Sequence, residues 1–250
     1  MRRPYLLGFI RNCRDLPSEP PFSIDVTTLG DHSVIWCKSP REIFTTKQDF
    51  LSAMLQWFEQ VQHLQLTVLP VQSGVSVSAE VDLVELLRIY KRELDLCFDK
   101  VDGCSEYCLT IAKRRQEFAQ IAYSSLRENV QSGKEYLERI RAWHQLLEKQ
   151  ALQAREVIAQ VCLRLTPWIK DYWSEIPQTG GGGINLGFLV PNLFKQEFSS
   201  ELQSLLEEAD FTDQWTGPWP PFHFSSFSLK SESFLIHEAL SWGRGGLPGD

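Results

Sequence analysis

The sequence predicts an α+β protein of two modules: an N-terminal α+β module and a C-terminal ferredoxin-like module with a long helix and a C-terminal helical tail. Short runs of apolar and β-branched residues alternate with longer segments whose apolar residues recur at helical spacing. After a turn at Asp102-Gly103, the elements follow the order strand, helix, strand, strand, helix, strand, which is typical of a ferredoxin-like fold. We therefore predict domains at residues 1–104 and 105–250.

The N-terminal module is predicted to begin with three strands and a helix. Residues 4–11 and 32–38 are rich in apolar and β-branched residues, and residues 25–29 form a further strand before a tight turn. A helix is expected over residues 47–64, because its apolar residues lie three or four positions apart. The residues of this apolar face are Phe50, Met54, Trp57, Phe58 and Val61.

The rest of the first module is predicted as a strand and a second helix. Residues 66–77 alternate loosely, and Pro70 indicates an edge strand or a bulge. A helix is expected to start at Ser78 or Ala79 and to continue to Phe98.

The second module contains the strongest periodic signal, in a helix predicted over residues 134–165 that follows a strand at 107–112. Its apolar residues alternate spacings of three and four, as in the seam of a coiled coil. Two interpretations stay open: packing within the chain, which the small Ala151 and Ala154 favour, or packing on a partner. The seam consists of Leu137, Ile140, His144, Leu147, Ala151, Ala154, Ile158, Val161 and Leu165.

Pro167 is expected to end that helix. Strands are predicted over residues 168–176 and 184–190, and a helix capped by Asn192 precedes a last strand at 213–216.

The tail, residues 225–250, is predicted to dock on the body through an amphipathic helix around residues 229–240. Residues 113–165 carry ten Lys or Arg against six Asp or Glu, whereas residues 194–250 carry three against nine. These opposite charges favour a contact within the chain.

Composition is that of an ordinary globular chain and excludes several partners. The hydrophobic fraction is 43%, the charged fraction 23% and the formal net charge −7. An acidic chain has no general electrostatic attraction for nucleic acid or for an anionic membrane. The uncharged stretches 60–79 and 176–194 are too polar to span a bilayer, and Arg11 interrupts the apolar start. We expect a cytoplasmic protein with no nucleic-acid, membrane or small-molecule partner.

Catalytic and metal-binding motifs are missing from the sequence. The six cysteines contain no C-x-x-C pair, and the five histidines are scattered. The four glycines at 180–183 precede an apolar strand instead of the helix that a phosphate loop needs. We therefore predict no catalytic residue, no metal, no cofactor and no enzymatic activity.

The segment 216–224 is the candidate partner-binding site. Its prolines and glycine restrict the backbone to turn and polyproline-like conformations, and it carries Trp219, Phe222 and Phe224. These three aromatic residues either cover the protein's own core or form a preordered surface for an apolar partner.

Six segments, in order along the chain, together resemble the gas vesicle protein family GvpF/GvpL. Two departures are Ser73-Gly74, where the family usually has Phe-Gly, and Phe222, where it usually has Tyr. The segments are residues 5–10, 66–74, 106–112, 132–137, 187–191 and 216–222.

The resemblance implies a minor structural and assembly protein of the gas vesicle, located on that vesicle in the cytoplasm. Its implied partners are the small hydrophobic main shell protein (GvpA-like) and other gas vesicle accessory proteins. It would assist nucleation and prevent aggregation of the shell protein. The alternative from another class is a small-molecule-binding regulatory module on a ferredoxin-like scaffold.

Overall fold

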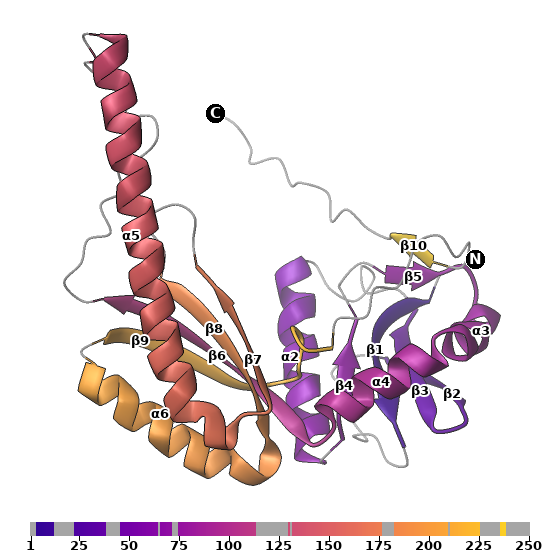
Figure 1. Ribbon diagram of the computed structural model, residues 1–250. Helices are drawn as coiled ribbons and strands as arrows, with labels where there is room; N and C mark the ends of the chain where they lie inside the picture. Colours follow the sequence, from indigo (N-terminus) through magenta and orange to yellow (C-terminus); the bar gives the residue numbers. More distant parts are fainter. Residues whose placement is uncertain are drawn as a thin grey trace. The chain divides into compact units, whose positions relative to one another are not determined.

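The computed structural model contains two compact units, which are described separately below (Figure 1). The first consists of Met1–Ser105 and Pro218–Asp250, and the second of Glu106–Gly217. Each unit combines a sheet with helices, so the predicted α+β class is confirmed. The predicted domains, 1–104 and 105–250, stay a prediction. The structure describes residues 4–12, 23–38, 46–64, 66–71, 75–113, 130, 132–176, 183–209, 211–225 and 236–238.

The first unit is built on a sheet with the strand order β10-β5-β1-β3-β2, and β4 also pairs with β1. The predicted strand at 66–77 is two short strands, and the predicted helix after Ala79 is divided at Tyr90 into α3 and α4. The elements are β1 (Tyr5–Arg11), β2 (Asp25–Leu29), β3 (His32–Cys37), α2 (Lys47–His63), β4 (Val68–Pro70), β5 (Val75–Val77), α3 (Val81–Ile89), α4 (Lys91–Val101) and β10 (Ile236–Glu238).

Helices pack on both faces of this sheet because its central strands are apolar on both sides. A bulge inserts Leu7 into β1, between the pairs Leu6–Trp36 and Gly8–Ile35. Because the bulge adds one residue, the alternation of side chains between the two faces of the sheet is reversed after it. One face packs against α2 in a core that contains Tyr5, Ile10, Ile35, Phe50, Trp57 and Phe58.

The second unit has the element order β6-α5-β7-β8-α6-β9 and the strand order β7-β8-β6-β9. The predicted order of strands and helices is therefore confirmed. Figure 1 shows α5 and α6 on the same face of this sheet. The elements are β6 (Cys104–Lys113), α5 (Gly133–Leu165), the 3-10 turns η2 (Thr166–Trp168) and η3 (Asn192–Phe194), β7 (Asp171–Glu175), β8 (Ile184–Pro191), α6 (Lys195–Ala209) and β9 (Phe211–Trp219).

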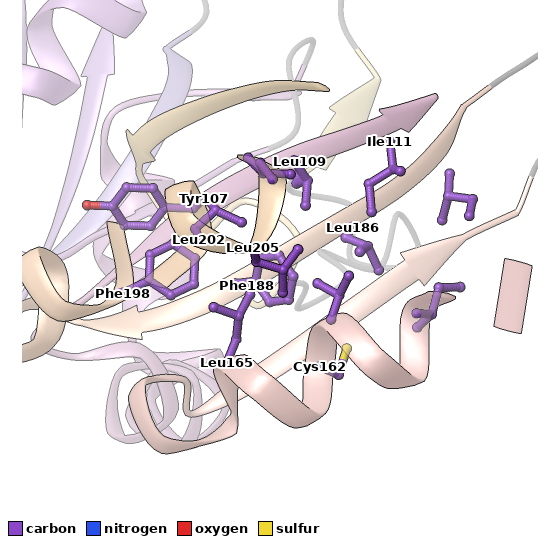
Figure 2. Close-up of a cluster of buried hydrophobic side chains, with 14 of the residues drawn as sticks. Tyr107, Leu109, Ile111, Cys162, Leu165, Leu186, Phe188, Phe198, Leu202 and Leu205 are labelled. Atoms are coloured by element: carbon purple, nitrogen blue, oxygen red, sulfur yellow. The ribbon is translucent and has the colours of Figure 1, made fainter. Parts of the chain in front are cut away.

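The core of the second unit lies between the sheet and the two helices (Figure 2). Alternate residues of β6 and β8 point into it, as the period of a strand requires. They meet the apolar faces of α5 and α6. The core includes Tyr107, Leu109, Ile111, Ile158, Val161, Leu165, Leu186, Phe188, Val190, Phe198, Leu202 and Leu205.

Helix α5 begins and ends where the sequence predicts. The Ser132 hydroxyl accepts the N–H of Glu135 at 3.2 Å, which is the first half of a capping box, and Pro167 follows the last helical turn. The seam is buried at its C-terminal end, where Ile158 is 7% exposed, but Leu137 is 57% exposed. No helix in the described ranges is long and apolar enough to cross a membrane.

The predicted C-terminal helix is wrong at Ile236–Glu238, which form β10 antiparallel to β5. A strand at the edge of a sheet leaves a row of backbone N–H and C=O groups to be paired. Pairing with these groups overrides the helical pattern of the local sequence at these three residues. The remainder of the predicted tail helix lies outside the described residues.

Candidate partner-binding site

The segment after β9 joins the first unit through a fixed turn. The N–H of Phe222 donates to the carbonyl of Pro220 at 2.7 Å, and the N–H of Ser225 donates to that of Pro221 at 2.9 Å. Both prolines are buried. Because proline rings fix the backbone and the two hydrogen bonds close the turn, the aromatic residues of this segment are held in defined positions.

The three predicted partner-binding residues differ in exposure. Phe222 is 40% exposed, and its ring meets Phe58 of α2 edge-on at 6.1 Å between centroids. Phe224 is only 6% exposed, and the Lys100 Nζ lies 5.5 Å from its ring centroid. Trp219 is half-buried. Of the three rings, that of Phe222 is therefore the most exposed, whereas Phe224 is buried in the first unit.

Sheet edges offer a second kind of surface. In the first unit β2 is an edge strand, and Asp25 at its start lies 3.9 Å from the Nζ of Lys38. In the second unit the edge strand β7 begins with Asp171 and ends with Glu175. Charged residues on an edge oppose pairing with another chain. Strand β5, Val75–Val77, contains no charged residue and lies next to β10.

A charged network on the first unit was not foreseen from the sequence. Arg11 Nη1 donates to Asp99 at 2.7 Å, and Lys91 Nζ donates to Asp95 at 2.8 Å. The buried His32 places Nε2 3.1 Å from the same Asp95 carboxylate. Burial lowers the pKa of His32, although Asp95 and Asp31 oppose the shift. His32 is therefore neutral at pH 7, and the Lys91 hydrogen bond holds the pKa of Asp95 below its ordinary value.

Ion pairs connect α5 and α6, whereas the contact predicted between the long helix and the tail, residues 225–250, stays a prediction. Arg164 of α5 donates to Glu201 at 2.8 Å through Nε and to Glu208 at 2.7 Å through Nη1. These contacts lie on the surface of the second unit and orient the two helices more than they stabilise them.

Two thiols of the second unit, the half-buried Cys108 and the buried Cys162, have raised pKa values. Burial and the neighbouring Glu106 carboxylate raise the pKa of Cys108 to about 12, and burial raises that of Cys162 to about 11. Without a bound metal, both thiols therefore stay protonated near neutral pH, and a protonated thiol is a poor nucleophile. None of the five cysteines in the described part of the chain is in a disulfide.

Comparisons with known proteins agree with this architecture. The family model for "Gas vesicle synthesis protein GvpL/GvpF" matches residues 14–226. The crystal structure of GvpF from Anabaena sp. PCC7120 superposes with a TM-score of 0.72 at 18% identity, covering 91% of this chain and 98% of that one.

The GvpF structure from Microcystis aeruginosa gives a TM-score of 0.70 at 17% identity and covers 91% of this chain and 100% of that one. No curated protein matches the chain. At these identities the two structures support the fold, and the family model, which spans most of the sequence, supports the family. The chain belongs to the GvpL/GvpF family of gas vesicle synthesis proteins.

Proposed function

We propose that this protein is a non-catalytic accessory component of the gas vesicle in the cytoplasm, which binds the main hydrophobic shell protein (GvpA-like) and assists nucleation of the shell. The match of the family model over residues 14–226 carries this proposal. Other gas vesicle accessory proteins are further partners under the same proposal.

The physical reason for such a component lies in the shell subunit. A subunit with exposed apolar surface and unpaired strand edges associates wrongly unless another protein covers these surfaces. This chain has a net charge of −7, which favours solubility of a complex, and it carries an exposed aromatic ring at Phe222 beside Phe58. Aromatic side chains are enriched where proteins bind apolar partners.

The test is the solubility of the shell subunit. The subunit would be co-expressed with the full chain or with an unrelated acidic protein of similar mass, and its fraction in the supernatant after centrifugation would be measured. We expect the soluble fraction to rise with the amount of this chain and to stay low with the control. Equal fractions in the two samples would refute the proposal.

A thermal-shift screen separates this function from the alternative, a small-molecule-binding regulatory module. Nucleotides and amino acids would be added to the full chain one at a time. Under the proposed function none raises the melting temperature. A reproducible rise with one of them would favour the regulatory module.

A further inference from the structure

On the edge of strand β5 that faces away from β1, the backbone hydrogen-bonding groups are those of Ser76. The N–H of Val77 donates to the carbonyl of Pro4 at 3.0 Å, so the backbone groups of Val77 point toward the side of β1. Backbone groups of successive strand residues point to opposite sides. The N–H and C=O of Ser76 therefore point outward, where the register places His237 of β10 opposite Ser76.

The strand that occupies this edge matches it poorly. Within the described residues the pairing comprises three residue pairs, and it places Glu238 opposite the half-buried Val75. Ser76 is 1% exposed, and its hydroxyl makes no hydrogen bond within the described structure. A buried hydroxyl without a partner weakens the pairing.

We propose that the outer edge of β5 is the site that receives an extended apolar segment of the shell subunit, with β10 as the resident strand that this segment displaces. This inference rests on the proposed function. An apolar residue opposite Val75 would cover this half-buried valine. A Ser or Thr opposite Ser76 could supply the missing hydrogen bond, and the backbone ladder would supply the rest of the affinity.

A second copy of this chain is the less favoured occupant. Its own β10 would bring the same three residues and therefore the same poor match. The resident β10 also has the advantage of high effective concentration, because it is tethered to the sheet that it binds. Only a segment of different, better matching sequence can overcome that advantage.

The first test fixes β10 in place. Ser76→Cys combined with His237→Cys joins residues opposite each other in the register, and the Cα separation of about 5.5 Å in such a pair allows a disulfide. The tagged full chain would be co-expressed with the main shell subunit, and the amount of subunit captured would be measured before and after reduction. We expect roughly tenfold lower capture by the oxidised variant and recovery on reduction. The single Ser76→Cys variant is the control.

The second test releases β10. His237→Pro removes the N–H that points to β5, whereas Glu238→Pro, the matched control, removes an N–H that points away from it. We expect about threefold higher capture with His237→Pro, because the tethered competitor is weakened, and little change with Glu238→Pro. Melting curves would establish that each variant is folded.

The outcomes separate the two proposals. Capture by the wild-type chain that is insensitive to both the disulfide and the proline would overturn the β5 site and leave the proposed function intact. Formation of a dimer by His237→Pro without increased capture would also overturn it, in favour of strand exchange between copies. Failure of every form, including wild type, to capture the subunit would refute the proposed function and this inference with it.

Discussion

Replacing Gly187 with alanine should destabilise the second unit, because the neighbouring strand leaves no room for a methyl group. Gly187 of β8 lies opposite Trp173 of β7. A Cβ at position 187 would come within 1.8 Å of the Trp173 Nε1. That nitrogen donates to the buried Glu106 carboxylate at 3.3 Å, so the indole cannot move aside without loosening this hydrogen bond.

The expected magnitude follows from these contacts. Ordinary carbon contacts are about 3.5 Å, so the indole has to shift by more than about 1.5 Å. Inserting a methyl group into packed surroundings destabilises by about 1–3 kcal/mol, and weakening a hydrogen bond to a buried charged group adds about 1–3 kcal/mol. We expect a loss of about 3 kcal/mol in the free energy of unfolding, which corresponds to a fall of about 12 °C in melting temperature.

Urea unfolding of Gly187→Ala, Trp173→Ala and the double variant measures this interaction. In the Trp173→Ala background, Gly187→Ala should cost less than about 1 kcal/mol, because the clashing ring is gone. Gly133→Ala is the matched control, since a Cβ there meets no atom within 4 Å. Additive effects of the two substitutions, or a stable Gly187→Ala single variant, would refute the reasoning.

Three further predictions concern stability. Ile158→Asp should lower the free energy of unfolding by several kcal/mol, because it buries an unpaired charge. Leu137→Asp, at an exposed position, should change it by about 0.5 kcal/mol or less. Equal melting temperatures of the two variants would contradict this prediction. Phe224→Ala should cost about 3–5 kcal/mol and Phe222→Ala about 1 kcal/mol, and the reverse order in urea unfolding would show that the wrong ring was assigned to the core. The pKa of His32 is lower in the folded protein than in the unfolded chain, so its contribution to stability is present above about pH 6.5 and is lost as the pH falls. His32→Asn should therefore flatten the fall in melting temperature between about pH 7 and 5. An unchanged slope would contradict this prediction.

The parts of the fold that could be predicted from the sequence are those with local signals. Helix α5 was predicted at 134–165 and occupies Gly133–Leu165, because Ser132 and Glu135 mark its start and Pro167 its end. The ferredoxin-like order of the second unit followed from turn residues and periodicity for the same reason. Such signals depend on neighbours in the chain and can therefore be read from one sequence.

The failures concern contacts between distant segments. Strand β10 forms because β5 offers an open edge, and nothing in the local sequence around Ile236 records that edge. Other contacts likewise join residues far apart in sequence. Trp173 lies opposite Gly187 and donates a hydrogen bond to Glu106. His32 lies beside Asp95. One signal in the sequence could have indicated the contact with Trp173: Gly187 lies inside the otherwise apolar strand β8, and such a glycine often marks the close approach of another group.

The candidate site was predictable only as a segment. The prolines and aromatic residues of 216–224 identified a stiff, ring-bearing stretch, but they could not decide which ring is buried. That choice depends on the turn closed by the Phe222 and Ser225 amides, which turns Phe224 inward beside Lys100 and leaves Phe222 exposed beside Phe58.

The central claim, that this chain keeps the shell subunit on the path to a vesicle, is tested most directly by following that subunit in cells. In a vesicle-forming cell that lacks this chain, the fraction of shell subunit in the buoyant vesicle layer would be compared with that in the same cell carrying the gene again. The proposed function predicts that the subunit moves from the buoyant layer to the insoluble pellet without the chain and returns when the chain is restored. An unchanged buoyant fraction in the absence of the chain would contradict it.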